Sequence, residues 1–493
     1  MAKQLFELKY IFGLKVKELR QQKGITYQEL NQRSGLSISY LSEIESGKKY
    51  PKGDKIALLA DSLGVSYDDL VSLKVPEKLQ PVVDLLESDF MREFPLEEFG
   101  VNPQKLMEVV AQDPTRANAF IKTIIQVARG YELKKENMYY AALRSYQELQ
   151  HNYFGDLEEA VEELHLEFTE LKDIPFQPDL LEDILLKIGV RTNYQKLSKY
   201  QSLQDLRSLY HTTNRMLYIN QGLSKGQKNF LLGREIAFQW LKLRNRPNGT
   251  PPQESMSFES ILNNYKASYF SAALIMPNRN VLPDTRKFAN LKKWKPEKFL
   301  DFITRYDATP EMIMQRLTNI LPYYFNLQNL FFLRFLKKDG KFYLTKELHL
   351  NEQHNPHANE LNEHYCRRWL ATRNISDLER KERTTGDMLA GAQLSRYYET
   401  DNEYFCLSVA FPNVSNPEES ISVTIGFLND RALKKRIRFI DDKSVKRDTV
   451  NITCERCAIR DCEVRAADPD IFQYEEGRRA MVNDIDSILS EKE

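Results

Sequence analysis

The sequence is poor in cysteine and has no long uninterrupted apolar run. Its 493 residues include five cysteines, and an odd, clustered set argues against the disulfide framework of a secreted protein. No apolar stretch approaches the length that crosses a bilayer, and the first 20 residues carry charges throughout, unlike the apolar block of a signal peptide. We therefore expect a cytoplasmic globular protein with no membrane partner.

The sequence also lacks net charge. Lys plus Arg and Asp plus Glu each total 70, so overall charge identifies no partner and the local distribution has to be read instead. Two stretches are locally basic: "SGKKYPKGDK" (46–55), with four lysines, and "RALKKRIRFIDDKSVKR" (431–447), with eight basic and two acidic residues.

Hydrophobic periodicity divides the chain into segments of different type. The length exceeds what one ordinary core supports, and helical patterns give way to strand-like runs in the middle of the chain. The predicted fold class is α+β multidomain. The predicted domains are an all-helical N-terminal domain (1–75), a helical connector (76–175), a mixed α/β domain (176–285) and a C-terminal domain (286–493).

The stretch "TYQELNQRSGLSISYLSEIESGKKYP" (26–51) has the spacing of a helix-turn-helix motif. Short helices are expected to begin near Thr26, Ser37, Lys52 and Ser66, with Gly35 in the turn. Residues 8–73 resemble the DNA-binding domains of the XRE/Cro-repressor family, in which the second helix of the motif enters the major groove. The alternative is a helix bundle with a solvated basic loop.

Outward positions around the second helix of the motif are the candidate DNA contacts. The base-edge candidates are Ser37, Ile38, Ser39, Ser42 and Glu43, and the phosphate candidates are Tyr27, Gln28, Tyr40, Lys48, Lys49 and Lys52. One such module makes few phosphate contacts. We therefore expect a homodimer or higher homo-oligomer that binds two half-sites of a double-stranded DNA operator.

Two later stretches, "NFLLGREIAFQWL" (229–241) and "ASYFSAALIMP" (267–277), resemble the ImmA/IrrE type of metallopeptidase domain. In that type a His-Glu-x-x-His helix holds zinc and its glutamate activates water. Here the three positions are Arg234, Glu235 and Phe238, and residues 263–267 offer no carboxylate as a third ligand. We therefore expect an ImmA/IrrE-like domain without zinc ligands, no catalytic residue and no enzyme activity. The alternatives are an active metal-dependent peptidase fused to a repressor and a docking module for a partner protein.

Three of the five cysteines lie together in "CERCAIRDCEVRA" (454–466). Cys454, Cys457 and Cys462 can converge on one centre, and thiolates suit zinc or an iron–sulfur cluster. We favour the cluster because it tolerates a non-cysteine fourth ligand more readily than zinc does. The weaker alternative is three buried thiols. For zinc, the candidates for the fourth ligand are His364, Cys366 and Asp461.

These three features together resemble the short-chain fatty acid regulators, which are XRE-type transcription regulators. The stretches 305–320 and 331–346 and the Cys366-Arg-Arg-Trp369 element support the resemblance. It implies a C-terminal sensor domain for a short-chain acyl-CoA and for redox state, with a [4Fe-4S] cluster in part of the family. Where the family tends to have glycines, this chain has Glu363, His364 and Tyr365.

The basic run 431–447 is the candidate site for the phosphates of an acyl-CoA. Guanidinium groups match the geometry of phosphate oxygens, although a charge run is more often a solvated face, and the resemblance is what favours the binding role. The candidate residues are Lys434, Lys435, Arg436 and Arg438.

Overall fold

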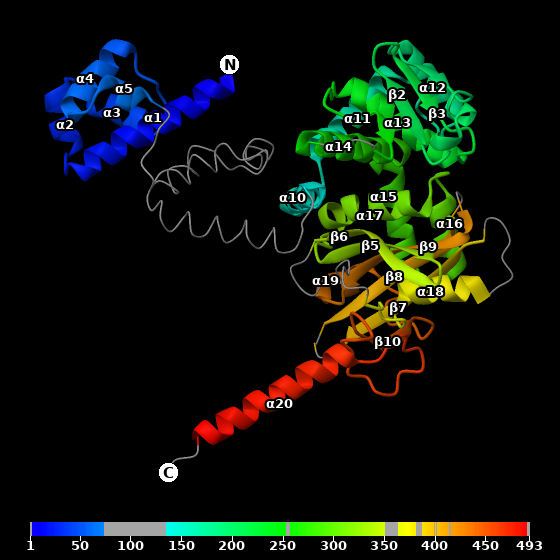
Figure 1. Ribbon diagram of the computed structural model, residues 1–493. Helices are drawn as coiled ribbons and strands as arrows, with labels where there is room; N and C mark the ends of the chain where they lie inside the picture. The colour runs from blue at the N-terminus through cyan, green and yellow to red at the C-terminus, as the bar shows by residue number, and fades with distance from the viewer. Residues whose placement is uncertain are drawn as a thin grey trace. The chain divides into compact units, whose positions relative to one another are not determined.

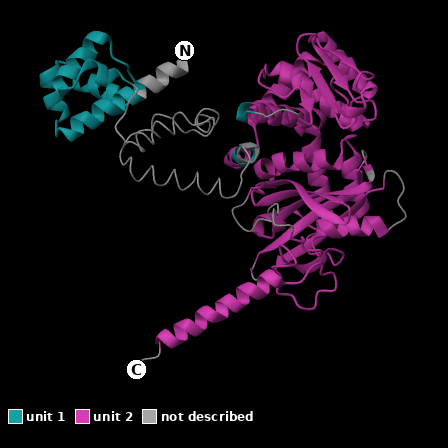
Figure 2. Cartoon of the chain, viewed as in Figure 1, with its two compact units in different colours: residues 1–142, 255–259 teal, residues 143–254, 260–493 magenta. Residues whose placement is uncertain are grey.

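The chain forms two compact units in the computed structural model, which describes residues 2–72, 135–252, 257–350, 363–380, 387–398, 400, 402–413 and 416–490. Unit 1 comprises residues 1–142 and 255–259, and unit 2 comprises residues 143–254 and 260–493 (Figure 2). Residues 76–134 of the predicted connector lie outside the described residues. The boundaries near residues 175 and 285 remain predictions.

Unit 1 carries the predicted helical domain, and its helix starts follow local capping signals. The hydroxyl of Thr26 accepts from the Glu29 amide at 3.2 Å while the Glu29 carboxylate accepts from the Thr26 amide at 2.7 Å, which is a capping box. Gly35 ends the first helix of the motif at φ 68°, a conformation that glycine adopts without strain. The helices are α1 (Ala2–Gln22), α2 (Tyr27–Ser34), α3 (Ile38–Glu45), α4 (Gly53–Leu63) and α5 (Tyr67–Val71) (Figure 1).

The core of unit 1 holds α3 against α1. Leu36, Leu41 and Ile44 are buried as their spacing predicts. The two helices approach so closely that a Cβ added at Gly13 would lie 2.2 Å from the carbonyl oxygen of Ile44, so no larger residue fits there without movement of the backbone. This close contact orients the outward face of α3.

Unit 2 begins with helices and a small sheet. The four-stranded sheet has the order β1-β3-β2-β4, with β1 parallel to β3 and the other pairs antiparallel. The elements are α10 (Lys135–Leu149), which spans the boundary between the units, α11 (Gly155–Glu167), α12 (Pro178–Lys187), β1 (Arg191–Asn193), the short 3-10 helices η2 (Leu197–Lys199) and η3 (Gln201–Leu203), β2 (Ser208–His211), β3 (Met216–Ile219), α13 (Lys225–Trp240), β4 (Gly249–Thr250) and α14 (Phe258–Ile275).

The second half of unit 2 is built on a six-stranded sheet of order β10-β7-β8-β9-β5-β6. All its pairs are antiparallel except the edge pair β10–β7, which is parallel. The elements are α15 (Asn278–Ala289), α16 (Pro296–Thr304), α17 (Pro310–Phe325), β5 (Leu330–Lys338), β6 (Lys341–His349), α18 (Leu370–Arg380), β7 (Leu389–Tyr397), β8 (Glu403–Asn413), β9 (Asn416–Leu428), α19 (Arg431–Arg436), β10 (Lys446–Val450) and α20 (Asp470–Ser490) (Figure 1).

Alternating residues of the large sheet enter two different cores. Phe332 of β5 belongs to the core shared with α15, α16 and α17, whereas its neighbours Phe331 and Leu333 pack in the core of α18, as the two-residue period of a strand requires. The sheet is therefore covered by helices on both faces. The α+β multidomain class predicted from the sequence is confirmed.

A buried ion pair ties α11 to α17. Arg316 is fully buried and donates to both carboxylate oxygens of Glu158 at 2.6 and 2.9 Å. Tyr269 of α14 also donates to this carboxylate, at 2.7 Å. Removing one partner of such a bidentate pair would strongly destabilise the fold, because the other charge would stay buried without a counter-charge.

None of the described helices is both long and apolar enough to cross a membrane.

Candidate functional sites

Helix α3 presents a short polar face at its N-terminal end. Ser37 caps the helix by accepting from the Tyr40 amide at 3.2 Å. Ser37, Ile38, Ser39 and Ser42 are exposed, and Glu43 is half-buried. Small side chains let a helix enter the major groove closely, where the base edges are read. The structure thus places the predicted base-reading residues on one outward surface.

Glu45 holds α3 in position from the buried side of the helix. This residue was not identified from the sequence. Its carboxylate is almost fully buried and accepts from Arg20 of α1 at 2.7 and 2.8 Å and from the Tyr27 hydroxyl at 2.7 Å. Burial and this hydrogen bond raise the pKa of Tyr27 to about 12. Because the hydroxyl proton of Tyr27 points inward, it is unavailable to a phosphate. In this structure Tyr27 thus stabilises the motif through Glu45, and its role as a phosphate contact stays a prediction.

The other phosphate candidates surround α3. Lys49 forms an ion pair with Glu43 at 2.7 Å and lies 5.7 Å from the centre of the Tyr40 ring. These three residues form a cluster that links the loop to the helix. Tyr40 is half-buried, and the exposed candidates are Gln28, Lys48, Lys49 and Lys52.

Ile38 is the apolar member of the reading face, and 44% of its surface is exposed. Apolar side chains in the major groove pack against the C5 methyl group of thymine. We expect Ile38→Ala to weaken binding to a selected operator about fivefold, the worth of roughly one buried methyl or methylene group. Replacing the contacted thymine by deoxyuridine, which lacks that methyl, should cost about the same.

The measurement is a titration of both proteins with both duplexes. The two changes should be non-additive, because each removes one side of the same contact. Ser39→Ala is the control and should retain the deoxyuridine penalty. If the penalties of Ile38→Ala and of every thymine replacement simply add, Ile38 contacts no thymine methyl.

Helix α13 carries the residues that stand at the zinc-binding positions of the metallopeptidase type. Arg234 donates to the hydroxyl of Thr250 at 3.0 Å and to the side-chain oxygen of Asn264 on α14. Both carboxylate oxygens of Glu235 accept from Arg246, at 2.8 and 2.6 Å. Guanidinium, amide and phenyl groups do not ligate zinc, and the carboxylate is occupied by an arginine. This donor set does not fit a zinc ion.

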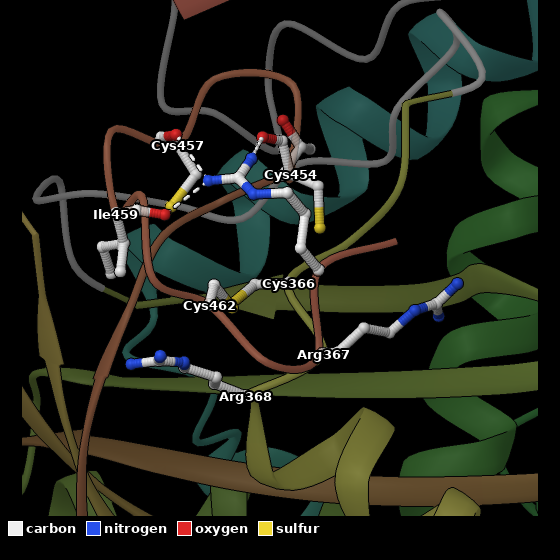
Figure 3. Close-up of a pocket in the computed structure, with 9 residues that line it drawn as sticks. Cys366, Arg367, Arg368, Cys454, Cys457, Ile459 and Cys462 are labelled. Carbon is white, nitrogen blue, oxygen red and sulfur yellow. Dashed lines mark hydrogen bonds between the residues drawn. The ribbon is translucent and has the colours of Figure 1, made fainter. Parts of the chain in front are cut away.

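The cysteine loop comes together with a segment 88 residues earlier in the chain. Cys366, Cys454, Cys457 and Cys462 line one pocket (Figure 3). A bridge between Tyr365 and Thr453 joins the two segments, and the Cys454 amide donates to the carbonyl of His364 at 2.8 Å. Among the three candidates for a fourth ligand, Cys366 is the one that lines the pocket.

Charged side chains hold the loop in this position. Arg465 donates to the carbonyl oxygens of Cys454, Cys457 and Ile459 at 2.8, 3.1 and 2.5 Å (Figure 3). Two side-chain contacts hold the loop to the earlier segment: a hydrogen bond between Glu455 and His364 at 2.8 Å and an ion pair between Arg456 and Glu363 at 2.8 Å. Two of the three residues that stand where the resembled family tends to have glycines, Glu363 and His364, thus bind the loop through their side chains.

The chemistry of this pocket fits a thiolate-bound centre, although its geometry is not preformed. As the side chains lie, no group of three or more His, Cys, Asp or Glu residues in the described part of the chain is arranged to hold a metal ion. The cavity measures about 10 Å³, room for little more than one water. The buried Nη1 of Arg367, which also lines the pocket, has no hydrogen-bond partner among the described residues. The guanidinium end of Arg367 points away from the sulfur atoms (Figure 3), so the chemical fit rests on the four thiols, which are soft ligands of the kind that zinc and iron–sulfur clusters take.

The predicted acyl-CoA residues lie on and after α19. Lys434, Lys435 and Arg436 form the last turn of this helix, Arg438 follows it, and all four are exposed. Arg436 donates to the carbonyl of Phe325 at 3.1 Å. Cations at a helix C-terminus also stabilise the helix itself, and the three residues in the last turn of α19 stand where they do so.

Comparison with known proteins agrees with two of these regions. Residues 16–70 match the helix-turn-helix family, and residues 186–318 match the IrrE N-terminal-like domain. A solved structure of a Mycobacterium tuberculosis transcriptional regulator is 16% identical, with a TM-score of 0.45, over 66% of this chain and 92% of that one. No curated protein matches the chain. The chain therefore carries one region similar to helix-turn-helix domains and a second region similar to the IrrE N-terminal-like domain.

Proposed function

We propose that the chain is a one-component transcription regulator, in which unit 1 binds a double-stranded operator and unit 2 senses a short-chain acyl-CoA. The observation that carries the proposal is the exposed face of α3 with its adjacent lysines, in a domain of the helix-turn-helix family. The exposed basic residues of α19 and the family resemblance support the effector. A homodimer would supply two recognition helices for two half-sites.

The test begins by selecting an operator from random duplex DNA with the full-length protein. Binding to that operator is then titrated with acetyl-CoA, propionyl-CoA and free CoA. The proposal predicts one footprint with two half-sites and a change of affinity with an acyl-CoA. Selection of no sequence would overturn the DNA-binding role. Selection without any response to the three CoA compounds would overturn the effector and favour docking of a partner protein.

We also propose that Cys454, Cys457 and Cys462 hold a [4Fe-4S] cluster, with Cys366 as the fourth ligand and zinc as the alternative. A bound cluster would supply sensitivity to oxidation. Burial raises the pKa of the Cys366 thiol to about 11, so this thiol stays protonated at neutral pH until a metal displaces the proton. Because the cavity is small, the cysteine side chains would have to rotate to admit a cluster. Arg465 would keep the loop backbone in place as they do so.

We further propose that the IrrE-like domain is not an active peptidase. The full-length protein should cleave neither casein nor a peptide library at any zinc concentration, because Arg234 and Phe238 cannot ligate the metal. Glu235→Ala should leave this result unchanged. Cleavage that depends on zinc and disappears in Glu235→Ala would establish the alternative of a peptidase fused to a repressor.

A further inference from the structure

Within the described residues, the positions of α13 that correspond to zinc ligands in the metallopeptidase type carry more positive than negative charge. Arg234 is 6% exposed, and its two terminal nitrogens donate to neutral groups, the Thr250 hydroxyl and the Asn264 amide oxygen. The neighbouring carboxylate, Glu235, is held at both oxygens by Arg246. Among the described residues, two guanidinium groups therefore stand beside one carboxylate, which gives this group of side chains a net charge of +1.

Each of the two arginines also has an unused donor at this site. The Nε atoms of Arg234 and Arg246 are buried and have no hydrogen-bond partner among the described residues. Both guanidinium groups face the ring of Phe238, with their central carbons 5.8 and 3.6 Å from the ring centre. A buried donor without an acceptor costs free energy, and a buried charge without a counter-charge costs more.

The protein environment acts against the charge of Arg234. Burial, and after it the nearby charge of Arg246, lower the pKa of Arg234 to about 10. The side chain still carries its proton at neutral pH. Arg207, which is exposed, adds to the positive potential around it. The two acceptors of Arg234, Thr250 and Asn264, are half-buried.

We propose that this site binds a small anion, a phosphate or a carboxylate group, where a related peptidase holds a metal cation. An arginine in place of a zinc ligand would thus make the site bind anions instead of cations. An anion would accept from the unused Nε donors and neutralise the excess charge. The proposal is independent of the role of α19 and of the cysteine pocket.

The test measures thermal unfolding of the full-length protein in phosphate, acetate or chloride at constant ionic strength. The midpoint should rise with the binding anion by about 5–10 °C at a concentration one hundred times its Kd. Arg234→Met keeps the length of the side chain and removes the charge, so it should abolish this rise. Arg244→Ala removes an exposed arginine nearby and should respond as the unmodified protein does.

The stability of Arg234→Met in chloride separates binding from a structural role. If Arg234 is an anion-binding residue, Arg234→Met in chloride should be at least as stable as the unmodified protein, because the variant lacks a buried charge that has no counter-charge. The proposal would be overturned if Arg234→Met were less stable and if all three anions changed the unfolding midpoints of both proteins equally. Arg234 would then have a purely structural role. A rise with phosphate alone identifies the ligand group as phosphate, and a rise with acetate alone identifies it as carboxylate.

Should Arg234→Met fail to fold, Arg234→Lys provides the comparison. Lysine keeps the charge but lacks the Nε donor and the planar fork of arginine. The anion should then bind about tenfold more weakly than to the unmodified protein. An unchanged affinity in Arg234→Lys would also overturn the proposal, because the unused Nε would play no part.

Discussion

Protein purified without oxygen is expected to be brown and to lose its colour and iron when any one of the four pocket cysteines is replaced by serine. A cluster needs its thiolate ligands, and the loss of one releases or destabilises the iron. The unmodified protein should contain iron and sulfide in comparable amounts, with broad absorption in the visible range. Metal analysis and a visible spectrum measure both. The four variants are Cys454→Ser, Cys457→Ser, Cys462→Ser and Cys366→Ser.

Cys406 offers a matched control, because it is buried on β8 and does not line the pocket. Cys406→Ser should stay brown. Retained iron in Cys366→Ser would reassign the fourth ligand and leave the other three. A colourless protein with one zinc per chain would establish a structural zinc site instead. Free alkylation of all the pocket thiols in a folded, metal-free protein would defeat both versions.

Replacing Lys48 and Lys49 together by alanine should weaken binding to every DNA sequence roughly ten- to fiftyfold near physiological salt. It should also reduce the slope of log affinity against log salt concentration by about 2, since each lost phosphate contact contributes about 0.9. Between the single variants, Lys48→Ala should have the larger effect, because the charge of Lys49 is paired with Glu43. Fluorescence anisotropy with selected and random duplexes measures both quantities.

The control removes the same charge elsewhere. Lys298 and Lys341 are exposed lysines of unit 2, and their joint replacement by alanine should leave the salt slope unchanged. By contrast, Ser39→Ala and Glu43→Ala should change which sequence is preferred. If the Lys48 and Lys49 variant keeps its affinity and slope, the docking of α3 in the major groove is wrong.

The parts of the fold that were predictable rest on short-range chemistry. The expected helix starts at Thr26, Ser37, Lys52 and Ser66 coincide with the residues that cap α2, α3, α4 and α5. The turn between β5 and β6 is equally local: Asp339-Gly340 is a typical hairpin dipeptide, and both residues adopt positive φ. In each case the deciding interaction lies within a few residues along the chain.

The parts that escaped prediction depend on residues far apart in the sequence. Glu158 and Arg316 form an ion pair although they lie 158 residues apart in the sequence. The hydrophobic periodicity of their two helices does not indicate which charged residue pairs with which. Glu45 looks like an ordinary polar residue of α3 until Arg20 and Tyr27 converge on it. For the same reason, the sequence left Cys366 as one of three candidates, and the bridge between Tyr365 and Thr453 supplies the missing information.

Strand β10 connects the cysteine loop to the rest of the sheet in a way that bears on solubility. It pairs in parallel with β7 and forms one end of the six-stranded sheet, and the loop begins four residues after it. If the cysteine loop detached from residues 363–366, β10 would be free to separate from β7. The backbone N–H and C=O groups of β7 that now pair with β10 would then be exposed. Such an open edge is a template for pairing with another chain. Since β10 has five residues and β7 has nine, the segment that carries the cysteines is expected to keep the longer of these two edges paired.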